Sequence, residues 1–225
     1  MDIELLNLNF EKCIKGWHLI NSSVINETIW EDINVIIFNS IGIKIYSKSD
    51  GSHLSGMDID SSFGRISNKS AKYSKNKKYI DISSYRLTTV CSDNNTGNII
   101  DIINEINKRK NYDYYSIIVR NENDVNIEYD WYMFPSNYLI FEPNSYEWKP
   151  IISKKGKKIN MQIGWTTNEI NGCKMSIYFN MSSQLWIHIN ISDEIKKFII
   201  ANVKIINKPK YNYIELYEKL GSDNI

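Results

Sequence analysis

The sequence predicts a mixed α/β (α+β) fold in which a central mixed β-sheet is flanked by helices. Two observations support this. Apolar residues recur at helical spacing in a few separate segments, and short β-branched or alternating runs lie between and after them. The 225 residues are 42% hydrophobic and 24% charged, which is ordinary for a globular protein of one domain.

Helical segments are predicted near the start, in the middle and near the end of the sequence. In residues 23–40 a single apolar stripe is formed by Ile25, Ile29, Ile33, Ile36 and Ile37. Residues 97–110 carry a similar stripe and end in Lys108, Arg109 and Lys110, which suit a helix C-terminus. We expect shorter helices over residues 9–20 and 211–220.

The strands are predicted from β-branched or alternating runs bounded by turn residues. In the first half we expect them at 43–47, 57–60, 64–71 and 79–85. In the second half we expect them at 112–120, 126–134, 159–165, 173–181 and 184–190. There is no internal repeat and no linker rich in Pro, Gly or Ser.

Charge and cysteine content narrow the class of protein. The formal net charge is +1, so the chain has no overall basic field, although positive charge can still gather on one face. Three widely spaced cysteines argue against a zinc site and for reduced thiols. An acidic N-terminus and the lack of an apolar run of about 20 residues predict an intracellular, cytoplasmic protein without membrane contact. The sequence has no glycine-rich phosphate loop, so we expect no nucleotide cofactor.

The stretch SGMDIDSSFGRISNKSAK, residues 55–72, contains the acidic and basic residues that most clearly indicate a function. It predicts two antiparallel strands with a turn near Ser62. If Asp58 lies opposite Ser67, strand parity puts Asp58, Asp60, Arg65, Ser67 and Lys69 on one face and the isoleucines on the other. A shift of one residue would undo this grouping.

Acidic and basic groups on one face suit phosphodiester hydrolysis. Carboxylates can hold one or two Mg²⁺ ions, which help to deprotonate the attacking water and stabilise the leaving oxygen. A nearby lysine can orient that water and offset charge on the phosphorane. The alternative is an ordinary solvated hairpin, because Asp and Lys often share a polar strand face.

The pattern GMD…SNK resembles the PD-(D/E)xK nuclease signature of type II restriction endonucleases, with Asp58 and Lys69 at the matching positions. The flanking stretches GSHLSGMDI and ISNKSAKYSKNKKYIDISSYRLT are also similar to stretches in such enzymes, and the resemblance covers roughly residues 27–90. It implies a restriction-endonuclease-like core and Mg²⁺-dependent, sequence-specific hydrolysis of double-stranded DNA. It also implies a homodimer, because palindromic sites mirror twofold symmetry.

Two positions depart from the family pattern. Gly56-Met57 stands where the family often has Pro, and Ser67 stands where the second acid is expected. Some family members take that acid from about a dozen residues later, which here is Asp81. Asp60 is a nearer substitute.

Family members also often draw a metal-binding Glu from an N-terminal helix, which here is Glu27 or Glu31, with Glu31 preferred. The resemblance therefore implies a catalytic set of Asp58, Lys69 and Asp81, and a metal set of Asp58, Asp81 and Glu31.

Several polar residues outside the hairpin are candidates for DNA contact, although each also suits a solvated turn or surface ion pair. Basic and hydroxyl groups can bind phosphate, Arg can read guanine, and amides can pair with adenine. The candidates are Lys72, Lys75, Ser83, Arg86, Asn180 and Gln184.

We therefore predict one endonuclease domain over residues 1–225, with a catalytic core at about 20–135 and a strand-rich recognition and dimer part at about 136–225. The predicted activity is that of a type II site-specific deoxyribonuclease. Two alternatives remain open: a structure-specific DNA nuclease on the same core, and a non-enzymatic nucleic-acid-binding protein of a virus or phage.

Overall fold

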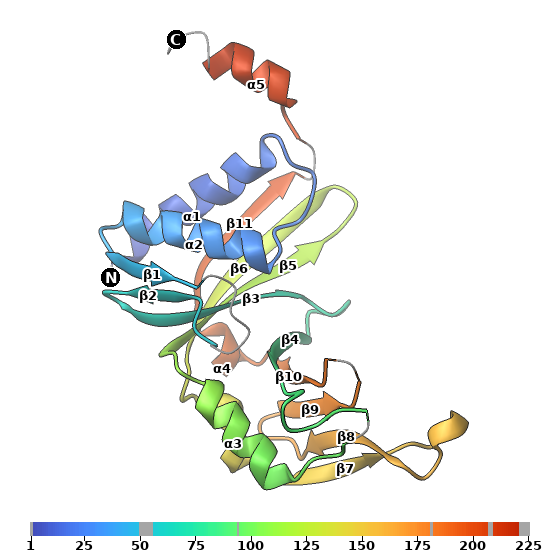
Figure 1. Cartoon of the computed structure of the whole chain (residues 1–225). Helices are drawn as coiled ribbons and strands as arrows, with labels where there is room; N and C mark the ends of the chain where they lie inside the picture. The colour runs from blue at the N-terminus through green and yellow to red at the C-terminus, as the bar shows by residue number, and fades with distance from the viewer. Residues whose placement is uncertain (1, 50–55, 94, 181, 207–208, 221–225) are drawn as a thin grey trace.

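The computed structural model describes residues 2–49, 56–93, 95–180, 182–206 and 209–220. Within this part of the chain the strands form two sheets, one of six strands and one of five (Figure 1). The six-stranded sheet has the order β1 (Ile45–Lys48), β2 (Ile59–Ser61), β3 (Gly64–Lys72), β5 (Tyr114–Glu122), β6 (Asn126–Pro135) and β11 (Ile199–Ile206). The five-stranded sheet has the order β4 (Tyr79–Arg86), β10 (Gln184–Asn190), β9 (Lys174–Tyr178), β8 (Gln162–Thr167) and β7 (Trp148–Ile152).

The four helices predicted from the sequence are present, and the structure adds the single turn α4 (Asp193–Lys196). The four helices are α1 (Ile3–His18), α2 (Glu27–Ser40), α3 (Ile99–Arg109) and α5 (Tyr213–Leu220). Short 3₁₀ turns follow at Leu139–Phe141, Pro143–Ser145 and Gly156–Lys158. Among the described residues, no helix combines the length and apolar character that crossing a membrane requires.

The mixed α and β content is confirmed, but the expectation of one central sheet is wrong. Strand β4 follows β3 along the chain, yet it leaves the first sheet and pairs with β10. The reason lies in the pattern of buried residues. Strand β5 is apolar on both faces, as a central covered strand must be, whereas β4 and β10 alternate buried isoleucines with polar residues and so cover only one side.

Each sheet contains a strand from the other side of the boundary predicted near residue 135. Strand β4 comes from the first part of the chain and lies in the second sheet, while β11 comes from the second part and pairs with β6. Strands β7 and β11 have no counterpart in the sequence prediction. The two predicted parts are therefore interleaved in space.

Strands β3 and β5 are parallel, whereas the other neighbours in the described sheets run antiparallel. A parallel pair needs a long connection, and here the chain between them includes β4 and α3. Helices α1 and α2 cover one face of the six-stranded sheet, and the five-stranded sheet and α3 share a core with its other face.

The core beneath α1 and α2 is built around Trp131 of β6, whose side chain is fully buried. The Trp30 ring meets it edge-on at 5.0 Å between centroids, and Phe10 and Phe38 pack against it at 5.6 and 6.2 Å. Both helices are thus fixed to the same point of the sheet by large apolar contacts.

Two neighbouring isoleucines of α2 test this packing. Ile37 is fully buried, while Ile36 is 55% exposed. Ile37→Ala should lower the free energy of unfolding by about 2–5 kcal/mol, because it leaves a cavity in the core. Ile36→Ala should change it by less than about 0.5 kcal/mol. Urea denaturation measures both, and equal losses would contradict the assigned face of α2.

Candidate active site

The β2–β3 hairpin has the register that groups its charged residues. Ile59 pairs with Ile66 and Asp60 with Arg65, so Asp58 lies across from Ser67. The Asp58 backbone N–H donates to the Ile66 carbonyl at 2.8 Å. The register assumed from the sequence is therefore confirmed, and Asp58 and Lys69 belong to the same side of the hairpin.

Asp58 is held at the edge of β3 by the backbone of that strand. Its Oδ2 accepts the Asn68 backbone N–H at 2.6 Å and lies 3.5 Å from the Ser67 hydroxyl. Strand β2 ends opposite Ile66, so the rest of β3 extends past it. Asp58 takes over part of the hydrogen bonding that a longer β2 would have provided.

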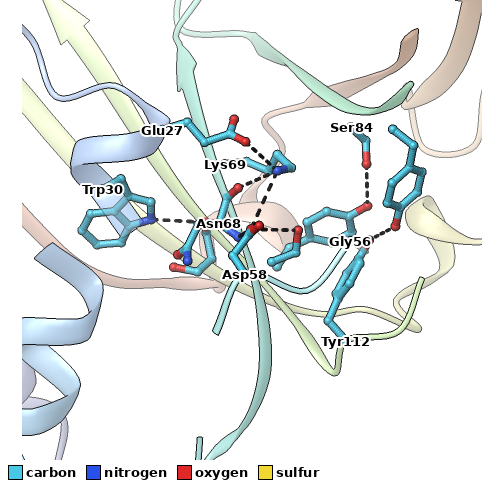
Figure 2. A network of polar contacts seen from close by, with 12 residues as sticks. Glu27, Trp30, Gly56, Asp58, Asn68, Lys69, Ser84 and Tyr112 are labelled. Atoms are coloured by element: carbon cyan, nitrogen blue, oxygen red, sulfur yellow. Dashed lines mark hydrogen bonds and ion pairs between the residues drawn. The ribbon is translucent and has the colours of Figure 1, made fainter. Parts of the chain in front are cut away.

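Lys69 is buried at the same edge and lies between two carboxylates, as Figure 2 shows. Its Nζ donates to Glu27 Oε1 at 2.7 Å and to the Asn68 carbonyl at 2.7 Å, and it is 4.0 Å from Asp58 Oδ2. Hairpin and helix therefore meet at this amine.

Helix α2 brings two acids to the site. Its N-cap is Asn26, whose side chain accepts the Ile29 N–H, so Glu27 is the first helical residue. Glu31 follows four residues later on the same face. The sequence prediction preferred Glu31, but Glu27 makes the direct contact with Lys69.

The face of α2 that carries these acids is also tied to the sheet by buried hydrogen bonds, made by Trp30 and Asn34. The Asn34 side-chain amide donates to Asn68 Oδ1 at 2.6 Å and to the Ser116 hydroxyl at 2.7 Å. The Trp30 indole N–H donates to the Ser116 carbonyl at 3.3 Å, and that of Trp131 to the Ser116 hydroxyl at 2.9 Å. These contacts fix the helix relative to β3 and β5, and with it the carboxylates of Glu27 and Glu31.

The site holds more negative charge than its lysine neutralises. Burial, together with the charges of Asp58 and Glu27, raises the pKa of Glu31 to about 7. Burial also raises the pKa of Asp58, against the opposing effect of Lys69. Burial alone would lower the pKa of Lys69, but Glu27 and Asp58 raise it, so this amine is protonated at neutral pH.

The donor chemistry of this cluster fits a hard cation. Carboxylate and carbonyl oxygens are the ligands that Mg²⁺ takes, and Asp58, Glu27, Glu31 and the Asn68 carbonyl supply them. In the described part of the chain, however, no three acidic, His or Cys side chains are already grouped as a metal site. Lys69 occupies the space between Glu27 and Asp58 instead.

Asp81, expected to supply the missing carboxylate, lies elsewhere. It is on β4 between the fully buried Ile80 and Ile82, so strand parity turns it to the outer face of the five-stranded sheet. There it contacts His188 at 2.8 Å. The structure does not bring Asp81 to Asp58, because β4 has joined the other sheet.

The candidate DNA contacts fall into separate places. Lys72 at the end of β3 pairs with Glu122 at 3.2 Å, and Lys75 is exposed in the turn that follows. Asn180 has its side-chain oxygen engaged by the backbone N–H groups of Ser182 and Ser183, so it closes a turn.

The other three candidates lie on neighbouring strands. Gln184 pairs with Arg86, and Ser83 pairs with Trp186, across the β4–β10 ladder. The structure thus brings Ser83, Arg86 and Gln184 together on one sheet face, with Trp186 beside them.

Two buried residues next to the site, Asn34 and Tyr115, were missed by the sequence interpretation. Asn34 is fully buried in the apolar stripe of α2, and a polar residue at such a position was the available signal. Tyr115, in register with Ser67 on β5, has a buried ring, and its hydroxyl lies 3.3 Å from that of Ser84. No sequence motif marked Tyr115.

The arrangement offers carboxylate oxygens, of the kind that hard cations take as ligands, beside a buried and protonated amine. Comparison of the chain with family models, curated proteins and solved structures finds no match. The chemical interpretation therefore rests on the geometry of the cluster and on its charges.

Gly56 lies just before Asp58, and the chain packs closely against its neighbours at this glycine. A Cβ at this position would lie 2.5 Å from the Arg109 carbonyl oxygen and 2.8 Å from the rings of Tyr85 and Tyr112. Gly56→Ala should therefore lower stability by about 1–3 kcal/mol. Gly16→Ala in α1 is the matched control: nothing lies within 4 Å there, and alanine should stabilise that helix by about 0.5–1 kcal/mol. Thermal unfolding of both variants checks this, and a neutral Gly56→Ala would contradict the close packing.

The raised pKa of Glu31 predicts a pH dependence of stability. Because the pKa is about 7 in the folded chain and 4.5 ordinarily, the folded state binds more protons in this window, and stability falls as pH rises through it. The Glu31 side chain is only partly buried, so after screening by solvent we expect a loss of about 1 kcal/mol.

Glu31→Gln should remove that loss and make the protein more stable than wild type at pH 8, with little difference at pH 5. Urea titrations at several pH values measure this. Asp124→Asn, in the exposed turn between β5 and β6, should leave the pH profile of wild type unchanged. A Glu31→Gln profile parallel to that of wild type would contradict the assignment.

Proposed function

We propose that this protein is a Mg²⁺-dependent nuclease that hydrolyses phosphodiester bonds in DNA. The observation that carries the proposal is the convergence of Asp58, Lys69 and the two α2 carboxylates at the edge of β3. Three acids and one buried amine leave a negative excess that a divalent cation would neutralise. A phosphate group can then approach a site that would otherwise repel it.

Asp58 would hold the metal together with Glu31 or Glu27. Asp58 is already oriented by the Asn68 N–H, which leaves its second oxygen for a ligand. The bound metal would lower the pKa of a water molecule and offset charge on the phosphate oxygens. The chain's own part is to fix these carboxylates on rigid elements, a hairpin and a helix.

Lys69 would act as a cation and hydrogen-bond donor. Its raised pKa keeps it protonated, so it would orient the attacking water or a phosphate oxygen by donation rather than take up a proton. Glu27 Oε1 and the Asn68 carbonyl hold the amine in place from the side of the protein.

The finer assignment is a type II restriction endonuclease with a restriction-endonuclease-like core, acting on double-stranded DNA as an intracellular homodimer. The support is the resemblance of GMD…SNK to the PD-(D/E)xK signature, together with the hairpin register that puts Asp58 opposite Ser67. The parallel β3–β5 pair beside the hairpin provides the rigid mixed sheet that such a site needs.

Cleavage assays test the nuclease. Wild type with Mg²⁺ should cut plasmid or phage DNA, and discrete fragments would favour the restriction class over a nuclease that needs branched DNA. Asp58→Ala and Lys69→Ala should each reduce the rate by about 100-fold or more. Asp60→Asn, two residues away on the same hairpin, should retain activity. Failure of wild type to cut linear, supercoiled, single-stranded and branched DNA with Mg²⁺ or Mn²⁺ would refute the proposal.

The source of the second carboxylate has its own test. Glu27→Gln and Glu31→Gln should lower cleavage at least about tenfold, whereas Asp81→Asn should not. Because Glu31→Gln is expected to be more stable than wild type, its loss of activity could not be ascribed to unfolding. Mg²⁺ should also raise the melting temperature of wild type and not of Asp58→Ala. Cleavage that depends on Asp81 and not on the two α2 acids would contradict this ligand set.

A further inference from the structure

The outer face of the five-stranded sheet is distinct from the cluster around Asp58. Isoleucines of β4 and β10 point into the shared core and are fully or almost fully buried, so the residues between them point outward. Register places five side chains in one row across the whole sheet, and this row consists of Ser83, Trp186, Ser176, Thr166 and Lys149. The row follows the strand order from β4 through β10, β9 and β8 to β7 (Figure 1).

Aromatic rings follow a diagonal across three strands of this face. Trp186 and Tyr79 are each 41% exposed and Tyr178 is 48% exposed. Tyr79 packs on the His188 ring with 4.6 Å between centroids, and His188 is two residues from Trp186 on β10. Tyr178 is two residues from Ser176, which pairs with Trp186. Residues that lie opposite each other, or one diagonal step away, on one face of adjacent strands have Cβ atoms about 5–8 Å apart, which applies to Trp186 and Tyr178.

Polar and charged groups surround these rings. Arg86 and Gln184 form a register pair at one end of β10. Arg86, Lys149 and Lys174 bring positive charge to this face, and Asp81, an acid on the same face, is already in contact with His188. Lys149 and Lys174 have acids only at 4.0 and 3.9 Å, on exposed side chains, and such pairs hold a charge weakly.

We propose that this face binds single-stranded nucleic acid, with unpaired bases stacked on Trp186, Tyr178 and the Tyr79–His188 pair and with the backbone tracked by Arg86, Lys149 and Lys174. Exposed rings offer their faces, and only unpaired bases can stack on them, since a duplex buries the faces of its bases. The cations match the phosphates in sign. This activity goes beyond the proposed cleavage of DNA, and it needs neither Asp58 nor a metal.

The test is fluorescence anisotropy with a fluorescein-labelled 12-nucleotide oligothymidine, in EDTA and at low salt, so that cleavage cannot interfere. Wild type should bind, and Trp186→Ala and Tyr178→Ala should each weaken the Kd by about 5- to 150-fold, the range for loss of one stacked base. Trp186→Phe, which keeps a ring, should recover most of the affinity. Tyr46→Ala is the matched control, because Tyr46 is 59% exposed on the other sheet and should not matter.

Two further arms separate this inference from the nuclease. Asp58→Ala should bind the oligonucleotide as wild type does, whatever the cleavage assays show. Unlabelled single strand should compete at least tenfold better than a duplex of the same length. No binding by wild type, binding unchanged in Trp186→Ala, or equal competition by duplex would each overturn the proposal.

Discussion

The structure depends on one buried group of hydrogen bonds, in which Asn34 of α2 binds both Asn68 of β3 and Ser116 of β5. These two strands are the parallel pair of the six-stranded sheet, and Asn68 and Ser116 are register partners. A single amide thus holds a helix to both strands at once. Because the backbone N–H of Asn68 donates to Asp58, the same residue links the core to the candidate active site.

This network is not fully satisfied. The Asn34 Oδ1 and the Asn68 Nδ2 are buried without a hydrogen-bond partner among the described residues. Leaving such atoms unpaired is expected to reduce stability by about 1–3 kcal/mol each, whereas apolar residues would fill the same space without that loss. These hydrogen bonds fix the rotation of α2 and its position along its axis more narrowly than apolar packing would. The position of the two helix acids relative to Lys69 depends on this.

The hairpin was predictable because its pattern is local. The alternation of acids, isoleucines and bases from Asp58 to Lys69 sets register through strand parity alone, and only one register buries the isoleucines. The acids of α2 were predictable as candidates from the helical stripe. The sequence prediction preferred Glu31, but the sequence could not show that Glu27 contacts Lys69, because this contact depends on where the N-cap places the helix against β3.

Asp81 shows why the rest could not be predicted. Its distance along the chain from Lys69 suited the family pattern, but whether β4 stays beside β3 is decided by a partner strand about a hundred residues away. The apolar alternation of β10 supplies that partner, and it draws β4 into a second sheet. Local periodicity identifies each strand, whereas long-range competition among strands determines the sheet to which it belongs.

The exchange of strands between the sheets also governs how the chain must fold. Asp81 and His188, which meet across the β4–β10 ladder, are 107 residues apart, and β11 completes the first sheet only after β10 has been made. Pairings this distant have to wait for loop closure, so folding is expected to be slow and to occur late in synthesis. An incomplete chain would carry the Asp58 hairpin but lack half of its supporting layers. Nascent chains should therefore lack a stable arrangement of Asp58, Lys69 and Glu27 until most of the polypeptide has emerged from the ribosome.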